Sequence, residues 1–168
     1  DAPVLSLIGN QQLLEDGSLT ILLSAFDVEG DNLNYSINGG LNIEASISGS
    51  ELVFNPSQDY FGSEEFTVVV NDGSLDDFET FTVTIDSVND APVLATVSDV
   101  SFDEDESGSI SLSGSDVDGD DLSYSITGGS DIIATLSGSD VNFSAPQDYN
   151  GSEEFSISLT DGNGGEDS

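Results

Sequence analysis

The chain has 168 residues and a formal net charge of −34, with 34 Asp and Glu and no Lys, Arg or His. This charge argues against binding to nucleic acid or to anionic membranes, which both need basic patches. The chain also has no Cys, so disulfides, Ser-His-Asp catalysis and Cys- or His-ligated zinc are excluded. Because 36% of the residues are hydrophobic and alternate with polar ones, we expect a folded protein that recruits cations, not a disordered chain.

An internal repeat predicts the domain organisation. Residues 1–79 align onto 90–168 without a gap, and matched pairs include Asp27/Asp116, Tyr60/Tyr149 and Asp72/Asp161. This period is too long for most solenoid repeats and suits tandem β-sandwich modules. The sequence therefore predicts one domain over residues 1–89 and a second over 90–168.

Short alternating segments separated by Gly, Asn and Asp turns run through the first repeat. No helical period interrupts them. They predict strands over 3–8, 19–25, 33–37, 43–47, 52–54, 66–70 and 78–88. Seven such strands favour an all-β fold, an antiparallel Greek-key sandwich of the Ig or cadherin type.

The second repeat follows the same pattern but stops at Ser168, before any counterpart of the seventh strand. A sandwich that lacks this strand would expose a hydrophobic slot and an open sheet edge. Two explanations are open at this point. Either the sequence is cut there, or a neighbouring copy supplies the strand, as in donor-strand assembly.

Acidic residues gather in four loops that recur in both repeats, and no cationic side chain exists to pair with them. Such loops suit Ca²⁺, which takes six to eight oxygen ligands. Tracing the predicted strands up and down brings several of these loops to the joint between the repeats. The predicted ligands at this joint are Glu15, Asp16, Asp59, Asp86, Asn89, Asp90, Asp116, Asp118, Asp120 and Asp161.

An equivalent acidic set is expected at the other end of the first repeat, facing a preceding module. It comprises Asp27, Glu29, Asp31 and Asp72, with Asp1 as the tail of an earlier linker.

Other interpretations of the acids are weaker. An EF-hand starting at Asp116 fails, because Asp121 stands where Gly is needed and Thr127 where Glu is needed. Any single acid can be solvated surface. Paired carboxylates can hydrolyse glycosides, but here each pair lies in a recurring loop that calcium explains better. We therefore expect no catalytic residues and no enzymatic activity.

The motifs together resemble bacterial cadherin-like tandem repeats. They are Glu15-Asp16, the Asp27–Asp31 loop, Tyr60-x-Gly62, Asn71-Asp72-Gly73 and Val88-Asn89-Asp90-Ala91-Pro92. The resemblance implies that Asp86, Asn89 (through its carbonyl) and Asp90 are linker ligands of calcium. It also implies ligands from Glu15 and Asp59 on one side, and from Asp116, Asp118 and Asp161 on the other. Phe61 and Ala91 depart from the cadherin pattern.

These features predict a calcium-stiffened segment of an extracellular bacterial protein, part of a surface fibre, filament or adhesin stalk. The alternatives are a carbohydrate- or partner-binding adhesin module and an accessory repeat of a secreted enzyme. No stretch of the sequence predicts insertion into a membrane.

Three residues predicted to point outward in the first repeat are apolar, whereas their counterparts in the second are polar. Leu22, Val53 and Val69 correspond to Ser111, Asn142 and Ser158. An apolar lateral patch could bind another copy of the chain.

We therefore expect the double substitution Leu22→Ser and Val53→Ser to weaken self-association, because it removes apolar surface from the contact. Sedimentation velocity over a concentration series measures this. An unaltered assembly would remove the hypothesis of a lateral patch.

Overall fold

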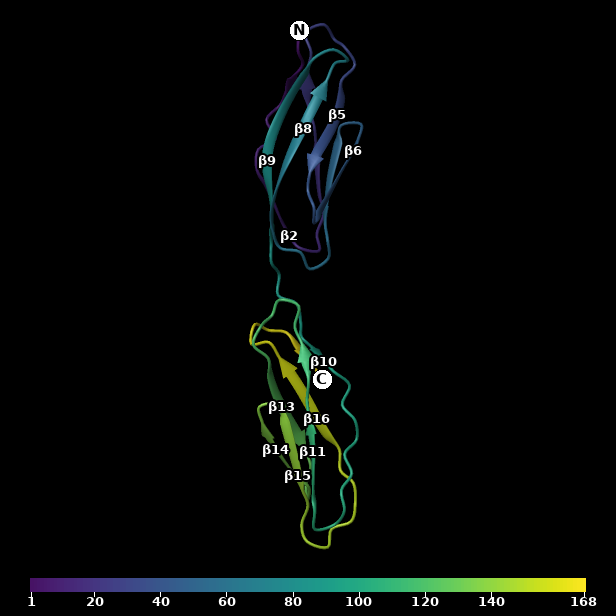
Figure 1. Cartoon of the computed structure of the whole chain (residues 1–168), viewed down its shortest axis with the longest axis vertical. Coiled ribbons are helices and arrows are strands. Elements are labelled where there is room, and N and C mark those ends of the chain that lie inside the picture. Colours follow the sequence, from purple (N-terminus) through teal and green to yellow (C-terminus); the bar gives the residue numbers. More distant parts are fainter. The chain divides into compact units, whose positions relative to one another are not determined.

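The computed structural model describes all 168 residues, which form two compact units, Asp1–Val88 and Asn89–Ser168 (Figure 1). We call them unit 1 and unit 2. Every regular element is a β-strand, so the predicted all-β fold class is confirmed. No helix is present that could cross a membrane.

Unit 1 is a β-sandwich. One sheet has the strand order β2-β9-β8-β5, the opposing sheet has the order β3-β7-β6, and β1 pairs with β4. All pairs are antiparallel except β2 with β9. The strands are β1 (Val4–Leu5), β2 (Gln11–Leu14), β3 (Leu19–Leu22), β4 (Ala25–Phe26), β5 (Asn34–Gly39), β6 (Ile43–Ser48), β7 (Glu51–Pro56), β8 (Gly62–Asn71) and β9 (Asp76–Asp86).

Alternation along the strands fills the core of unit 1. Phe66, Val68 and Val70 of β8 are fully buried, as the spacing of two predicts. The Phe66 ring meets the ring of Phe54 on the opposing sheet edge-on, with centroids 5.0 Å apart. Such aromatic pairs across the two sheets fix how the sheets stack.

The first predicted strand, over 3–8, is only partly correct, because the chain changes sheets there. The N–H groups of Ile8 and Gly9 donate to the carboxylate of Glu79, at 2.6 and 2.8 Å, and take no strand partner. Gly9 has a φ of 68°, which glycine adopts without strain. The chain therefore pairs with β4 through β1, crosses to the other sheet, and pairs with β9 through β2. The sequence analysis missed β2.

Unit 2 repeats this architecture. One sheet has the order β11-β15-β14, the other β13-β16-β17, and β10 pairs with β12. The strands are β10 (Val93–Leu94), β11 (Ser107–Ser111), β12 (Gly114–Ser115), β13 (Ser123–Gly128), β14 (Ile133–Ser137), β15 (Asp140–Ser144), β16 (Phe155–Thr160) and β17 (Glu166–Asp167). β17 supplies the first two residues of a seventh strand, so the prediction that the 168 residues stop before any counterpart of it is corrected by these two residues.

The alignment of the repeats without a gap is wrong near its end. Four residues separate β8 from β9, whereas five separate β16 from β17. The extra residue lies within 162–164, because Asp161 N donates to the Gly165 carbonyl as Asp72 N does to the Leu75 carbonyl, and Asp167 therefore takes the place of Asp77. The hydrogen bonds agree: Leu5 N donates to Asp77 Oδ2 at 2.8 Å, and Leu94 N donates to Asp167 Oδ2 at 2.7 Å.

The outward residues Leu22, Val53 and Val69 do not form one patch. Leu22 and Val53 share the outer face of one sheet, because β3 pairs with β7 with Thr20 opposite Val53. Val69 lies on β8 of the other sheet, opposite Phe78. The predicted lateral patch is therefore limited to the first two side chains.

A glutamate that the sequence analysis missed holds the turn between β5 and β6. The Glu64 carboxylate accepts hydrogen bonds from the N–H groups of Leu41, Asn42 and Ile43. Desolvation raises the pKa of Glu64, but the hydrogen bonds from this turn outweigh it and hold the pKa below its usual value. Glu153 accepts the N–H groups of the corresponding turn of unit 2, and the Gly-Ser-Glu-Glu sequence that recurs at 62–65 and 151–154 was the available signal.

We expect Glu64→Gln to lower the free energy of unfolding at pH 7 by about 1–2 kcal/mol, because three N–H donors lose a charged acceptor. A depressed folded-state pKa stabilises the fold above the unfolded value. This stability is lost as the pH falls from about 4.5 through the folded-state pKa. The difference between variant and parent in urea denaturation should therefore shrink below that pH.

The matched control is Glu65→Gln, since Glu65 is exposed on the same strand. Equal effects of the two substitutions at pH 7 would contradict the role assigned to Glu64.

Candidate metal centre

The acidic loop before β13 is a tight turn built by its own first residue. In Asp116–Asp120 the Oδ1 atom of Asp116 accepts the N–H of Asp120 at 3.2 Å. Gly119 has a φ of 80°, which closes the turn and favours glycine. The Asp27–Asp31 loop of unit 1 has the same construction, with a distance of 3.1 Å from Asp31 N to Asp27 Oδ1.

The second carboxylate oxygen of each leading aspartate is buried without a hydrogen-bond donor. These atoms are Oδ2 of Asp27 and Oδ2 of Asp116, and Asp27 as a residue is only 7% exposed. A buried carboxylate oxygen without a partner is costly. Since the chain has no Lys, Arg or His, the partner that fits this atom is a cation from solution.

Asp161 organises the turn between β16 and β17. Its Oδ1 accepts N–H groups of Asn163, Gly164 and Gly165, and its Oδ2 accepts the side-chain amide of Asn89 at 2.8 Å. The Asn89 amide lowers the pKa of Asp161 most, and the turn N–H groups lower it further against the opposing effect of desolvation. Asp161 is therefore ionised at neutral pH.

The start of unit 2 is tied to the same loops. Asp90 N donates to Asp118 Oδ2 at 2.8 Å, and Asn89 reaches Asp161 as described above. The structure thus brings together all six ligands predicted from unit 2. They are Asn89, Asp90, Asp116, Asp118, Asp120 and Asp161.

Three carboxylates of this group lie close enough to share an ion. One oxygen each from Asp116, Asp120 and Asp161 lie within 4.8 Å of one another. Two ligands of one Ca²⁺ ion can be at most about 5 Å apart, since calcium–oxygen distances are 2.3–2.6 Å. An all-oxygen donor set suits a hard cation such as Ca²⁺, and the residues present fit one.

Asn163 is a neighbour of this group that the sequence analysis missed. Its side-chain amide donates to Asp120 Oδ2 at 2.8 Å. It follows Asp161-Gly162 in the turn, so the Asp-Gly-Asn-Gly sequence was the available signal.

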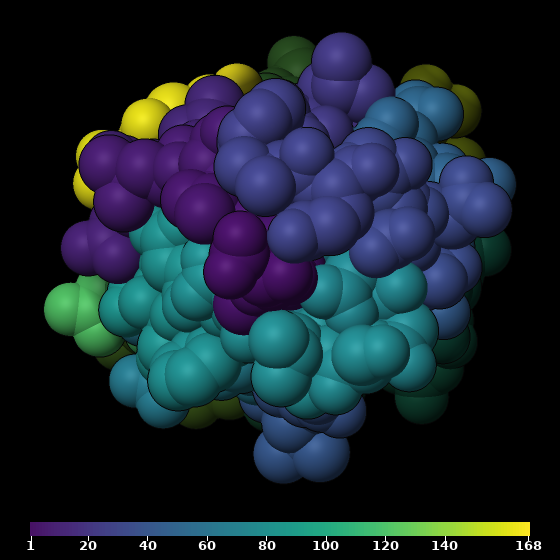
Figure 2. Space-filling model, turned by 90° about the horizontal axis from the view of Figure 1, so that it is seen from above, coloured from purple at the N-terminus to yellow at the C-terminus, as the bar shows by residue number.

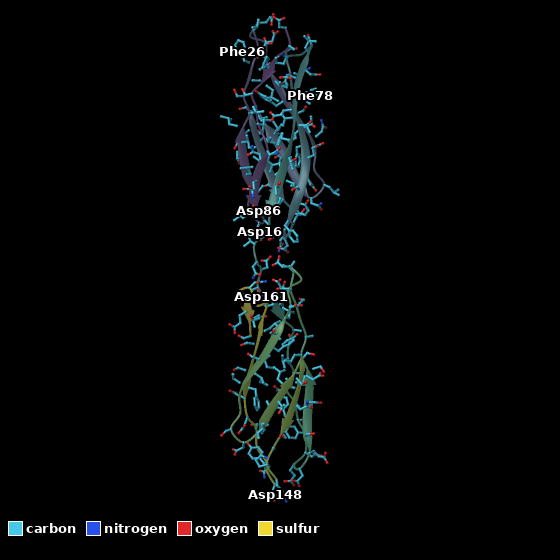
Figure 3. The ribbon with its side chains drawn as sticks, turned by 90° about the vertical axis from the view of Figure 1, so that its left-hand side faces the viewer. Asp16, Phe26, Phe78, Asp86, Asp148 and Asp161 are labelled. Atoms are coloured by element: carbon cyan, nitrogen blue, oxygen red, sulfur yellow. The ribbon has the colours of Figure 1, made fainter.

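The ligands predicted from the end of β9 and nearby loops have partners within unit 1. Asp59 N donates to Asp16 Oδ1 at 3.4 Å, and both residues have positive φ angles, 56° and 58°. Aspartate tolerates this conformation better than most residues, and Asp105 and Asp148 repeat the arrangement in unit 2. Asp16 and Asp59 therefore have a structural role within unit 1, and their role as calcium ligands stays a prediction. Figure 3 labels Asp16 and Asp86 at the same end of unit 1.

Hydrogen bonds of Glu15 join its loop to the end of β9 at Asp86 and to the residues that follow it. Glu15 N donates to the backbone oxygen of Asp86 at 2.9 Å, and Val88 N donates to Glu15 Oε1. The Asp86 carboxylate accepts the side-chain amide of Gln12.

The predicted acids at the opposite end of unit 1 surround the first residue of the chain. The Asp1 ammonium lies 2.9 Å from Glu29 Oε2, and the carboxylates of Glu29, Asp27 and Asp72 all raise its pKa, the hydrogen bond to Glu29 most. Figure 2 views this end and shows the purple N-terminal residues packed between blue-violet and teal segments. Asp72 also accepts the N–H groups of Ser74 and Leu75, so it resembles Asp161 in holding its turn.

Both units match the family model of the bacterial Ig domain, over residues 1–86 and 89–168. The chain belongs to this family. Its two bacterial Ig units also have the fold of human protocadherin-24 EC1-2, with a TM-score of 0.59, 17% identity, and coverage of 95% of this chain and 87% of that one. That likeness supports a cadherin-like arrangement of strands.

Two larger proteins contain a segment similar to these bacterial Ig units. Chitinase A of Pseudoalteromonas piscicida is 33% identical over 128 residues, which is 74% of this chain and 16% of the chitinase. The endo-fucoidan hydrolase MfFcnA4 of glycoside hydrolase family 107 aligns with 99% of this chain at 21% identity and a TM-score of 0.46. The chain spans only 27% of that hydrolase.

Gly165 is required by the packing around Asp161. A Cβ atom at this position would lie 2.2 Å from Asp161 Oδ2 and 2.7 Å from the Cα of Ala91. We expect Gly165→Ala to displace the turn and to lower the unfolding free energy of unit 2 by about 1–3 kcal/mol, the usual cost of overpacking.

Hydrogen exchange resolved by segment measures this effect, and the amides of unit 1 are the internal control. Unchanged protection around Asp161 would contradict the tight packing assigned to the turn.

Proposed function

We propose that this chain is a structural pair of calcium-binding bacterial Ig repeats, which stiffens an extracellular bacterial protein and performs no catalysis. The observation that carries the proposal is the orphaned Oδ2 atom of Asp116, beside the carboxylates of Asp120 and Asp161. The same orphaned atom recurs at Asp27 in unit 1, so it belongs to the repeated design of the two units.

Calcium supplies the positive charge that the side chains of this protein lack. Three carboxylates within 4.8 Å repel one another, and self-repulsion of a chain with a charge of −34 opposes compact structure. An ion that binds only the folded loops stabilises them by mass action, by about 2.7 kcal/mol at a concentration one hundred times its dissociation constant. The chain's own turns at Asp116 and Asp161 hold the ligands in place before the ion arrives.

The connection between the units is the part that this binding would stiffen. Asp86 precedes the short stretch Ser87-Val88, and Asn89 and Asp90 follow it. Neutralising the carboxylates on both sides reduces their mutual repulsion, and it favours a restricted joint over a loose one. Segments of a surface fibre or adhesin stalk need such stiffness.

A second candidate is an accessory repeat of a secreted enzyme. The similarity to chitinase A over 128 residues favours it. In that case the repeats would space or position a catalytic domain located elsewhere in the same protein. The calcium chemistry of the loops is the same in both cases, and both place the chain outside the cell.

We expect CaCl₂ to raise the melting temperature of the 168-residue chain relative to EDTA, because Ca²⁺ binds the folded loops only. Differential scanning calorimetry measures the shift, with NaCl of equal ionic strength as the control for screening. Small-angle scattering in the same buffers tests the joint, where calcium should narrow the distribution of shapes.

The substitution Asp116→Asn should weaken calcium binding at least about tenfold, because the orphaned oxygen is a direct ligand. Asp131→Asn removes the same charge from an exposed loop and should leave the affinity unchanged. Equal calcium affinities of the two variants would contradict the role assigned to Asp116. A melting temperature that does not change with calcium would mean that the acidic side chains are solvated surface residues and bind no calcium.

A further inference from the structure

Asn163 lies in the turn between β16 and β17, and the function proposed above gives it no role. The residue is exposed. Glycines flank it on both sides, Gly162 before it and Gly164 after it. These glycines have φ angles of 79° and 118°, which side chains rarely adopt and glycine adopts without strain. Asn163 therefore belongs to a turn whose backbone is restrained by hydrogen bonds and not by side chains.

An Asn-Gly pair can react with itself, because glycine has no side chain to block the approach of its nitrogen. The bond from Gly164 N to Asn163 Cγ forms, the Cγ–Nδ2 bond breaks, and ammonia leaves with the proton of the Gly164 N–H. Water then opens the resulting succinimide ring. Cleavage of the N–Cγ bond gives aspartate, and cleavage of the bond from the same nitrogen to the backbone carbonyl carbon of residue 163 gives isoaspartate. Both products carry a carboxylate in place of the amide, and water is the only co-reactant.

The structure holds two of the Asn-Gly pairs in different ways. The chain has three of them, at 38–39, 150–151 and 163–164. Gly39 lies in β5 and pairs with Phe66 of β8, and a Cβ atom on it would clash with the backbone oxygen of Glu65. A Cβ atom on Gly164 would have nothing within 4 Å. The nitrogen of Gly164 therefore has space to turn towards Asn163 Cγ, whereas the ladder fixes the first pair.

Two aspartates of the candidate metal centre hold the groups that would react. Asp161 Oδ1 accepts the Gly164 N–H at 3.0 Å, and Asp120 Oδ2 accepts the side-chain amide of Asn163 at 2.8 Å. An N–H group that donates to a carboxylate is a poorer nucleophile, because it must give up that strong hydrogen bond to attack. Exposed turns open locally at a small cost in free energy. The closed turn therefore slows the reaction, and each opening permits it.

We propose that Asn163 is a deamidation site, and that its conversion replaces the amide donor beside Asp120 with a carboxylate. In the metal-free chain the new charge faces Asp120 without a cation, and this repulsion destabilises the turn. When calcium occupies the centre, the aspartate product offers a further oxygen ligand beside Asp116, Asp120 and Asp161. This second effect rests on the proposed function, whereas the deamidation and the first effect do not.

Calcium should also slow the reaction that alters its own site. An ion bound by Asp120 and Asp161 stabilises the closed turn by mass action. The closed turn keeps the Gly164 N–H on Asp161. Asn163 should therefore be converted mainly in chains that lack the ion.

The reaction is measured in the intact 168-residue chain, incubated in heavy-oxygen water with EDTA, since each new carboxylate then takes up heavy oxygen. Mass spectrometry of peptic fragments locates the label. The same chain in urea gives the rate of each Asn-Gly pair without folded structure. We expect the ratio of native to urea rate to be at least about tenfold higher at Asn163 than at Asn38, because a turn opens more readily than a sheet. The variant Asp161→Ala should raise the native rate at Asn163 and leave that at Asn38 unchanged.

The product is tested with Asn163→Asp, and the matched control is Asn150→Asp. Figure 3 labels Asp148 and Asp161 at opposite ends of unit 2, so the control adds the same charge away from the centre. Scanning calorimetry in EDTA should give a lower melting temperature for Asn163→Asp than for the control. Isothermal titration with CaCl₂ should give an affinity at least about threefold higher for Asn163→Asp, because it adds a ligand.

Equal ratios of native to urea rate at Asn163 and Asn38, or no label at Asn163 in the native chain, would overturn the deamidation site. Equal melting temperatures of the two variants in EDTA would overturn the placement of the new charge beside Asp120. If the parent chain binds no calcium, the proposed function fails, and the labelling and the melting temperatures in EDTA still decide this inference.

Discussion

Thirty-four carboxylates and no cationic side chain constrain everything else in this protein. A typical fold pairs many of its acids with Lys or Arg, but here the available donors are backbone N–H groups, amide side chains and ions from solution. Glu64, Glu79 and Asp161 each accept hydrogen bonds from several consecutive N–H groups. Each of them therefore stabilises one turn or one crossing of the chain. The acids build loops as well as carrying charge.

This use of carboxylates also sets the candidate metal centre apart from the other acidic loops. Asp16 and Asp59 engage each other through a backbone N–H and occupy a left-handed backbone conformation that aspartate tolerates. Asp27 and Asp116 instead keep one buried oxygen without a donor. An unsatisfied buried oxygen, and not acidity as such, is the physical basis for proposing calcium at Asp27 and Asp116, and Oε2 of Glu15 at the other end of unit 1 shares this feature.

The two units have similar sequences and equivalent sheets, and within the 168 residues they differ in the length of one strand, which is β9 in unit 1 and β17 in unit 2. Where β9 is present, Phe66 is fully buried, β8 extends to ten residues and β2 forms. Where it is absent, Phe155 is partly covered and two segments lose their pairing. Sheet structure is cooperative across strands, since each strand completes the hydrogen bonds and covers the side chains of its neighbour.

The sequence by itself determined the fold class, the repeat, and which alternating residues face the core, because a side-chain period of two and glycine-rich turns are local properties. It also picked out the acids around Asn89, Asp116 and Asp161 from their recurrence. Only the tertiary structure decided that β1 and β2 belong to different sheets, that the turn after β16 is one residue longer than the turn after β8, and that Val69 lies apart from Leu22. Those outcomes depend on which distant group satisfies a given backbone N–H, as Glu79 does for Ile8 and Gly9. Such long-range partners leave no periodic signal in the sequence.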